Sequence, residues 1–434
     1  MNEDEGMKVK IPEVLMEAAN QLEIFYTDKF PALASLAKQC FLNTIETTVK
    51  MLEDGSCFVI TGDIPAMWLR DSAAQVKHYV KYAKEDANLR KILEGVIHKQ
   101  AELVCLDPYA NAFNESANGA GHKDETRLND CVWERKYEVD SLCAPLYLAY
   151  TYWKTVGTIN FFDETFKNMI EIIVKTFTTE QDHNKSPYLF RRYNCVKSDT
   201  LPNCGLGRPV NVTCMTWSGF RPSDDCCKLG YLIPANMMAV QALIYGKEIC
   251  EEVYKDKKLA KACESLAEEI NSGILDYGMV EHPRYGKIYA YETDGFGNYN
   301  LMDDANSPSL LAMPYLGYCK KEDPFYLNTR KFILSKDNPY YSEGKYAKGV
   351  GSPHTAPGYV WHIGITMQAL TSNDKQEIME CLKMLAATHD NTNFMHESFN
   401  PDNPAEYSRP WFAWANTLFA ELLEALMSND FWIS

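Results

Sequence analysis

The stretch WFAWANTLFAELLEALM, residues 411–427, indicates most clearly how this chain folds. Its apolar side chains recur at intervals of three and four residues, which places them on one face of an α-helix. The same interval recurs along the chain, often in paired segments separated by turn residues. The segments are Ala32–Leu52, Ala73–Ala83, Leu89–Leu106, Ser141–Thr155, Phe162–Thr179, Ala235–Tyr254, Lys258–Leu275, Ser307–Leu316, Tyr326–Leu334, Ile363–Leu370, Lys375–Thr388 and Trp411–Met427.

Strand-like alternation is sparse, with candidates at Cys57–Thr61, Tyr188–Arg191 and Ile288–Tyr291. Long loops rich in Gly, Asn, Asp and aromatic residues separate the helical segments, and a compact domain rarely keeps such loops unless they carry function. The pattern predicts an all-α barrel of two concentric helical rings, formed as one domain over residues 1–434, with a site built from the loops at one end. A helical bundle or an α-solenoid is the alternative, although no fixed repeat period favours a solenoid. The loops span 107–138, 182–233, 276–306, 337–358 and 390–410.

Charge and cysteine content restrict the partners of the protein. The 434 residues carry a formal net charge of −16, so neither a basic nucleic-acid surface nor a polybasic membrane patch is expected. The 14 cysteines are scattered without a CxxC pair, and the acidic N-terminus MNEDEG has no apolar stretch of the kind found in signal peptides. We therefore predict free thiols, a cytoplasmic location and no membrane span; a monomer is the default assumption.

A turn motif, TGDIPAMWLRDSA at residues 61–73, combines groups that rarely occur together. Trp68 offers a flat apolar surface, while Arg70 with Asp63 and Asp71 offers oriented donors and acceptors for hydroxyl groups. This mixture is typical of a sugar-binding pocket. A buried structural ion pair at a helix start is the other interpretation.

The loop TWSGFRPSDD, residues 216–225, supplies a candidate general acid. Asp224 and Asp225 lie close to several aromatic residues, and burial against rings raises the pKa of a carboxyl group. We therefore expect a raised pKa at this acid, as proton donation at neutral pH requires. Alternatively, one or both aspartates cap the helix that follows.

A second carboxylate lies in NFMHESF, residues 393–399. Glu397 stands between His396 and Ser398, and such polar neighbours would keep it ionised and able to orient a water molecule. We expect its pKa to lie below that of the acid. A structural salt bridge between Glu397 and Arg409 is the alternative.

Other loops supply residues that we expect to line the same pocket, namely Glu138, Asp304 and His354. His354 and His362 lie eight residues apart with no third partner, which does not favour a metal site. No Walker A loop, no GxGxxG after a strand and no nucleophile elbow is present, so no cofactor is expected. Two carboxylates on separate loops, many aromatic residues and no cofactor motif point to glycoside hydrolysis.

Five segments together resemble glycoside hydrolase family 125, a family of bacterial and fungal exo-α-1,6-mannosidases. The segments are TGDIPAMWLRDSAAQV, TWSGFRPSDD, GYLIPANMMAV, LMDDANSPSLLAMPYLGY and NFMHESFNPDNPAEYSRPWFAWANTLF. The resemblance implies an (α/α)6 barrel that needs no metal and releases terminal α-mannose, with inversion, from mannosides or N-glycan fragments. It also implies that Asp224, rather than Asp225, is the general acid and that Glu397 is the general base.

Two other interpretations compete with an α-mannosidase. One keeps the barrel but changes the sugar, for instance to that of a glucosidase or of a lyase that acts on uronates, although the acidic composition argues against anionic sugars. A catalytically inactive glycan-binding protein is the third interpretation. The presence of both carboxylates speaks against it.

Overall fold

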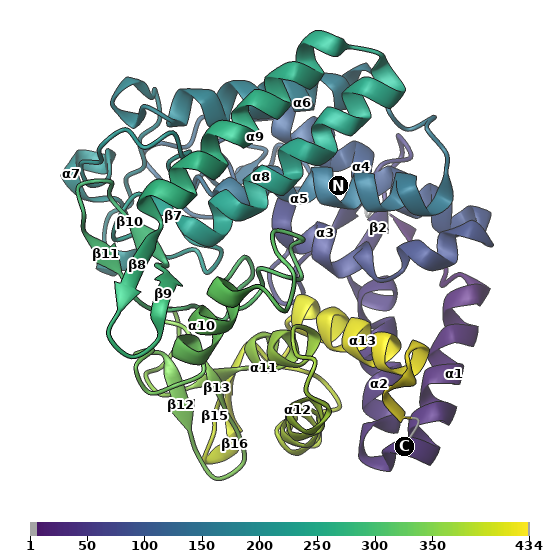
Figure 1. The fold of residues 1–434 in the computed structure, drawn as a ribbon. Coiled ribbons are helices and arrows are strands. Elements are labelled where there is room, and N and C mark those ends of the chain that lie inside the picture. The colour runs from purple at the N-terminus through teal and green to yellow at the C-terminus, as the bar shows by residue number, and fades with distance from the viewer. Residues whose placement is uncertain (1–6, 433–434) are drawn as a thin grey trace.

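A computed structural model describes residues 7–432, and its architecture is a barrel of helices (Figure 1). The helices are α1 (Glu13–Lys29), α2 (Ala34–Thr47), α3 (Leu69–Lys77), α4 (Ala87–Leu106), α5 (Val139–Val156), α6 (Glu164–Glu180), α7 (Pro202–Gly205), α8 (Ile233–Ile249), α9 (Lys257–Tyr277), α10 (Pro324–Ile333), α11 (His362–Leu370), α12 (Lys375–Ala387) and α13 (Ala413–Ser428).

The helices form two concentric rings. In the inner ring, α3 packs against α5 and α13, α5 packs against α8, and α11 packs against α13; α2, α4, α9 and α12 cover them from outside. Burial distinguishes the two rings, because the inner helix α11 buries eight of its nine residues whereas the outer helix α9 buries seven of 21. The predicted helical barrel is therefore confirmed.

Segment 307–316 completes the inner ring between α8 and α11, but it is a series of turns, so the predicted helix there was wrong. A cavity of about 70 Å³ is lined by residues of α3, α5, α8, α11 and α13 and by three residues of this segment. The two prolines of segment 307–316 have no N–H group to donate to a helical hydrogen bond. The buried carboxylate of Asp303 accepts the N–H groups of Leu310 and Leu311 at 2.8 and 2.9 Å, which diverts them from a helical ladder.

Two further differences from the sequence predictions concern local structure. Helix α1 was not identified, although its buried Leu15, Ala18, Leu22 and Tyr26 follow the helical interval. The predicted strand at 188–191 is irregular backbone.

Short strands precede the inner helices and position the functional loops. Three three-stranded sheets have the orders β4-β5-β6, β7-β10-β11 and β14-β15-β16, and β4, β7 and β14 lead directly into α3, α8 and α11. The strands are β1 (Met7–Lys8), β2 (Val49–Met51), β3 (Cys57–Val59), β4 (Met67–Trp68), β5 (Ala112–Phe113), β6 (Val132–Glu134), β7 (Tyr231–Leu232), β8 (Met279–His282), β9 (Gly286–Tyr289), β10 (Glu292–Thr293), β11 (Tyr299–Asn300), β12 (Tyr341–Glu343), β13 (Lys348–Val350), β14 (Val360–Trp361), β15 (Ser398–Asn400) and β16 (Asn403–Ser408).

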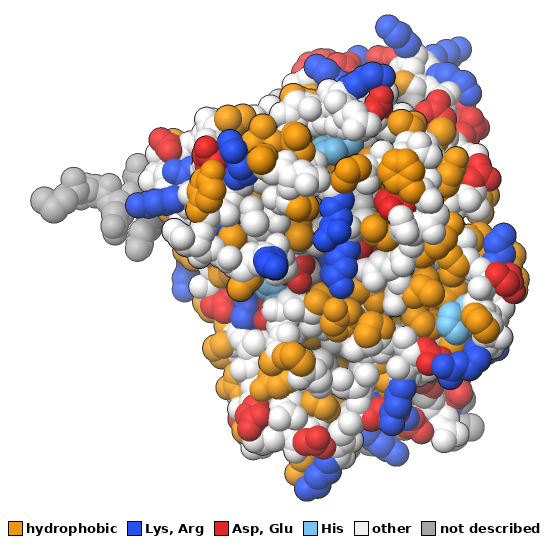
Figure 2. All heavy atoms as spheres, turned by 90° about the vertical axis from the view of Figure 1, so that its left-hand side faces the viewer, with side chains coloured by type: hydrophobic (Ala, Val, Ile, Leu, Met, Phe, Trp, Pro, Cys, Tyr) orange, Lys and Arg blue, Asp and Glu red, His pale blue; other side chains and the backbone are white. Residues whose placement is uncertain are grey.

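The surface charges and the state of the cysteines can be compared with the sequence predictions. On the face shown in Figure 2, hydrophobic side chains are interspersed with separate Lys/Arg and Asp/Glu groups. All fourteen cysteines are free thiols, as predicted. Within residues 7–432, no helix is both long enough and apolar enough to cross a bilayer. Residues 1–6, which entered the prediction of location, lie outside the described residues.

Candidate active site

A cavity of about 300 Å³ collects side chains from the predicted motifs, and its volume is that of a small-molecule pocket. Carboxylates, a guanidinium and aromatic rings share its wall. The lining residues are Thr61, Ile64, Trp68, Arg70, Asp71, Pro222, Ser223, Asp224, Asn306, His354, Trp361, Glu397, Arg409, Phe412 and Trp414.

Arg70 anchors one wall of the cavity. In the first turn of α3, its guanidinium contacts Asp71 at 2.5 Å, Asp140 at 2.8 Å and Glu138 at 2.9 Å. The Arg70 side chain is 6 % exposed, and those of Glu138 and Asp140 are 0 % exposed. The buried ion pairs of the second interpretation are therefore present, and Arg70 and Asp71 also face the cavity, while sugar binding by the motif stays a prediction.

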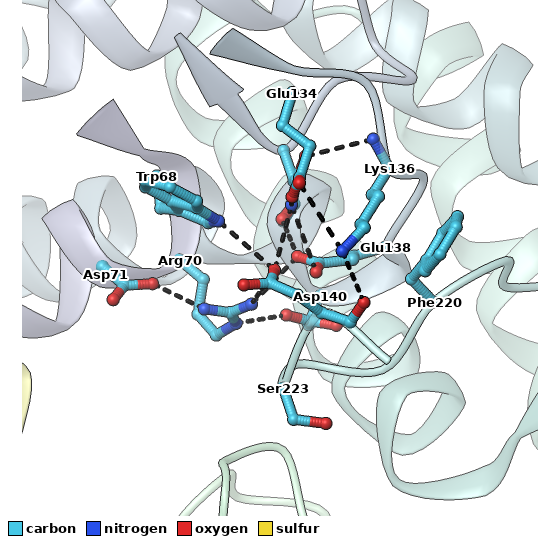
Figure 3. A network of polar contacts seen from close by, with 12 residues as sticks. Trp68, Arg70, Asp71, Glu134, Lys136, Glu138, Asp140, Phe220 and Ser223 are labelled. Atoms are coloured by element: carbon cyan, nitrogen blue, oxygen red, sulfur yellow. Dashed lines mark hydrogen bonds and ion pairs between the residues drawn. The ribbon is translucent and has the colours of Figure 1, made fainter. Parts of the chain in front are cut away.

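Asp224 lies among donors from separate segments. Its Oδ1 accepts hydrogen bonds from Trp68 Nε1 at 3.3 Å and from Asn111 Nδ2 at 3.1 Å, and Arg70 Nη2 lies 4.0 Å away. Figure 3 shows this network. We name as the Asp224 cluster the residues Trp68, Arg70, Asn111, Lys136, Glu138 and Asp224.

Lys136 holds the backbone at Asp224. Its Nζ donates to the Asp224 carbonyl oxygen at 2.8 Å and to Asp199 Oδ1 at 2.6 Å. Asp224 has a φ of 67°, a left-handed conformation that residues other than glycine adopt infrequently. The lysine contact stabilises this turn and so directs the carboxylate into the cavity.

The expected raised pKa at Asp224 was wrong. Burial raises the pKa of this carboxyl, but the positive charges of Lys136 and Arg70 outweigh burial and lower the pKa to about 2. Burial raises the pKa of the neighbouring Glu138 well above its usual range, even though Arg70 opposes the shift. The two opposite shifts therefore favour the proton on Glu138 over Asp224.

Asp225 has a different environment from that of Asp224. It is 6 % exposed and lies 3.3 Å from His354 Nδ1, but it does not line the cavity. Burial lowers the pKa of His354, yet the hydrogen bond to Asp225 prevails and raises it to about 9. Neither aspartate caps α8, because Leu232 occupies the N-cap position of that helix.

Glu397 occupies a second and simpler part of the cavity wall, at the start of the β15–β16 hairpin. Its Oε2 accepts a hydrogen bond from Ser408 Oγ at 2.8 Å, and Ser408 Oγ lies 2.7 Å from Ser398 Oγ. Arg409 Nη1 lies 3.8 Å from Glu397 Oε1, beyond hydrogen-bond distance. We name Ser398, Ser408, Arg409 and Glu397 the Glu397 cluster.

Three predicted site residues do not line the cavity themselves. At the rim, Asp63 Oδ1 lies 2.5 Å from Arg409 Nη2. Asp304 is fully buried and accepts from Ser223 at 3.1 Å and from Ser352 at 3.0 Å. Glu138 lies beneath Arg70. Each of the three therefore holds a residue that does line the cavity.

Sequence reasoning missed several functional side chains. Asn111 and Lys136 lie in the loop at 107–138, which was recognised as a functional loop without any residue pattern that singled them out. Trp361 and Trp414 precede or begin inner helices, and their helical context made them resemble core residues. Within residues 7–432, no group of three or more His, Cys, Asp or Glu side chains is arranged to hold a metal ion.

Comparison with known proteins places this site in context. Residues 30–424 match the family model described as metal-independent α-mannosidase (GH125). The solved structure of a Streptococcus pneumoniae protein of the metal-independent α-mannosidases, in a non-productive complex with α-1,6-mannobiose, is 47 % identical with a TM-score of 0.94, and the match covers 96 % of this chain and 99 % of that chain.

Two further similarities are lower in sequence identity. The meiotically up-regulated gene 157 protein of Schizosaccharomyces pombe is 41 % identical over 421 residues, which cover 92 % of this chain and 82 % of the relative. The glucoamylase of Saccharomycopsis fibuligera is 12 % identical with a TM-score of 0.59, over 99 % of this chain and 98 % of that chain. The glucoamylase supports the (α/α)6 barrel fold alone.

Proposed function

The chain belongs to glycoside hydrolase family 125, the metal-independent α-mannosidases, and we propose that it is an exo-acting α-1,6-mannosidase that inverts anomeric configuration. The observation that carries this proposal is that Asp224 and Glu397, from loops far apart in the sequence, line the same cavity. Hydrolysis of a glycoside needs a carboxylic acid for the leaving oxygen and a carboxylate for the incoming water. The substrates are mannosides or N-glycan fragments with a terminal α-mannose.

Asp224 is assigned as the general acid. Two N–H donors hold its Oδ1, which orients the carboxyl group and leaves Oδ2 for the proton that moves to the glycosidic oxygen. Because the proton leaves with the alcohol, Asp224 must enter the reaction protonated. Asp225, which is paired with His354, is not placed for this role.

Glu397 is assigned as the general base. The Ser408 hydroxyl fixes its Oε2. Its Oε1 has Arg409 only at 3.8 Å, so this oxygen can accept the proton of a water molecule that attacks C1. Attack by water on the face opposite the leaving group gives the inverted, β-configured mannose.

The remaining lining is suited to one sugar ring. Trp68 and Trp414 offer apolar faces, while Arg70, Asp71 and His354 offer hydrogen bonds to hydroxyl groups. Arg70 and Trp414 also line the 70 Å³ cavity, so they stand between the two cavities and bound this end of the pocket. A closed end favours removal of a terminal residue over cleavage within a chain.

The test is hydrolysis of α-1,6-mannobiose followed by proton NMR from the first turnover. We expect free mannose, with β-mannose appearing before mutarotation. The α-1,2- and α-1,3-linked isomers and isomaltose serve as controls for linkage and sugar. Initial release of α-mannose would contradict inversion, and preferential release of glucose from isomaltose would contradict the choice of sugar.

A further inference from the structure

Arg70 is surrounded by more negative charge than it can neutralise. Four carboxyl groups lie within 4.0 Å of its guanidinium, and they belong to Asp71, Glu138, Asp140 and Asp224. The side chains of Glu138 and Asp140 are 0 % exposed. Arg70 and Lys136, the second cation near Asp224, supply two positive charges against these four carboxyl groups, so at least one of the four is expected to carry a proton.

The hydrogen bonds of Asn111 indicate where this proton lies. Its Oδ1 accepts the backbone N–H of Lys136 at 3.1 Å, which fixes the amide so that Nδ2 faces the carboxyl groups. Nδ2 lies 3.1 Å from Asp224 Oδ1, 3.1 Å from Glu134 Oε1 and 3.3 Å from Glu138 Oε1. An amide nitrogen has two hydrogens, so it cannot satisfy three carboxylates.

Glu134 does not need the extra proton. Its Oε2 lies 2.7 Å from Arg192 Nη2 and 3.5 Å from Lys136 Nζ, so two cations stabilise its charged form. The missing hydrogen therefore belongs between Glu138 and Asp224. Because Glu138 is the more buried of the two, with 0 % against 28 % of the side chain exposed, its charged form is the more costly.

We propose that Glu138 carries a proton in the resting enzyme and shares it with Asp224, so that Glu138 is the immediate source of the proton that Asp224 gives to the glycosidic oxygen. This inference rests on the proposed role of Asp224 as general acid. Glu138 does not line the cavity and acts through Asp224, so it is a positioning residue that also supplies the proton.

The proton balance of the step is complete without an added reactant. The O–H bond of Glu138 breaks as an O–H bond forms on Asp224, and this second bond breaks as the leaving oxygen of the glycoside is protonated. The C1–O bond breaks, the attacking water forms a new bond to C1, and Glu397 takes its proton. After the products leave, one proton returns from Glu397 to the Glu138–Asp224 pair through solvent.

The charged surroundings of the pair agree with this assignment. Burial raises the pKa of Glu138, with Asp224 and Asp140 as further contributors, while Lys136 and Arg70 lower the pKa of Asp224. Ser141 Oγ donates to Glu138 Oε2 at 2.8 Å, so that oxygen needs no proton of its own. The charged groups around the pair are Arg70, Asp71, Glu134, Lys136, Asp140 and His354.

The decisive variant is Glu138→Gln, which keeps the shape of the side chain but cannot release a proton. On α-1,6-mannobiose at pH 7, we expect turnover to fall by ~10²-fold or more, the usual contribution of general acid catalysis. The basic limb of the pH–rate profile should move to lower pH, because Asp224 alone loses its proton earlier. Hydrolysis of α-mannosyl fluoride should stay close to the wild-type rate, since fluoride leaves without protonation.

Infrared spectroscopy tests the resting proton without any activity measurement. The wild-type minus Glu138→Gln difference spectrum at pH 7 should contain the C=O stretch of a protonated carboxyl group. Asp140→Asn is the matched control, because Asp140 contacts Arg70 in the same way but does not contact Asn111. Since Asp140 Oδ1 has no hydrogen-bond partner among the described residues, a band lost in Asp140→Asn instead would place the proton there and overturn the proposal.

Glu138→Asp, which keeps an ionisable carboxyl group, should restore part of the rate on mannobiose and a basic limb near that of the wild type. Equal loss on both substrates with an unmoved basic limb in Glu138→Gln would reduce Glu138 to a structural role. Failure of the wild-type enzyme to hydrolyse α-1,6-mannobiose would count against the proposed function alone. The infrared result would still decide where the proton lies.

Discussion

The two carboxylates of the cavity are held in contrasting ways. In the Asp224 cluster, the carboxyl group accepts two N–H donors, has two cations near it and shares a buried network with Glu138. In the Glu397 cluster, one hydroxyl group contacts the carboxylate, and the nearest guanidinium lies 3.8 Å away. The first carboxyl group is set in a densely charged environment, and the second in a sparse one.

This contrast matches what the two roles require. A proton donor needs a precise position and a local source of protons, which a buried network of shared charges provides. A base that activates water needs a charged oxygen with space beside it, and additional donors would lower its basicity. The same cavity therefore combines a densely bonded wall at the starts of α3 and α5 with a wall built on a β-hairpin.

The largest expected effect comes from Glu397→Gln, which removes the base. Hydrolysis of both α-1,6-mannobiose and α-mannosyl fluoride should fall by ~10⁴-fold, because water activation is needed whatever the leaving group. Steady-state rates on the two substrates measure this. Thermal unfolding should change little, since the amide still accepts from Ser408. Wild-type turnover of the fluoride by this variant would remove Glu397 from the mechanism.

Asp224→Asn should distinguish the role of the Asp224 cluster from that of the Glu397 cluster, because its effect depends on the leaving group. We expect a loss of ~10²–10³-fold on mannobiose, where the leaving oxygen needs a proton, and a much smaller loss on α-mannosyl fluoride. The ratio of the two losses is the measurement. Asp225→Asn is the matched control from the neighbouring position, and this variant should retain more activity on mannobiose than Asp224→Asn does. The reverse order would make Asp225 the acid.

Ser408→Ala removes the hydroxyl group that donates to Glu397 and tests its contribution to catalysis. Loss of one hydroxyl bonded to a carboxylate costs about 1.5–3 kcal/mol, and we expect kcat to fall by about 10- to 100-fold on either substrate. Ser398→Ala is the comparison, since that hydroxyl reaches Glu397 only through Ser408. If the two variants lose activity equally, the direct contact has no special role.

His354→Gln should give the smallest effect of these variants, a change in Tm that depends on pH. Burial lowers the pKa of His354, but Asp225, Asp224 and Glu397 raise it to about 9, above the value of about 6.5 in unfolded chains. The stabilisation by the cation is therefore fully present below pH 6.5 and is lost as the pH rises through 9. The difference in Tm between wild type and variant should shrink across this window. Because 37 % of the side chain is exposed, solvent screening keeps the difference small.

Several elements could be predicted from local sequence because their physical cause is local. The apolar interval in residues 411–427 corresponds to α13, and the same interval identified the inner helices α5, α8 and α11. The unrecognised α1 carries the same interval, so its signal was present. The cavity residues Trp68, Arg70 and Asp71 were also found, because their mixed chemistry within a few residues is itself a local feature.

Other features depend on residues that only folding brings together. Segment 307–316 has a helical interval, yet two prolines and the carboxylate of Asp303, which folding turns back onto Leu310 and Leu311, prevent a helix. The direction of the pKa shift at Asp224 was mispredicted because Lys136 and Arg70 lie far from it in the sequence.

The amino-acid sequence by itself determined the helical barrel, the family and the two carboxylates, since periodicity and motif chemistry are written along the chain. Tertiary structure alone decided which aspartate faces the cavity, which carboxyl groups lie one layer behind it and how their protons are shared. The physical reason is that pKa values depend on burial and on charges within a few ångströms, and sequence distance does not measure either.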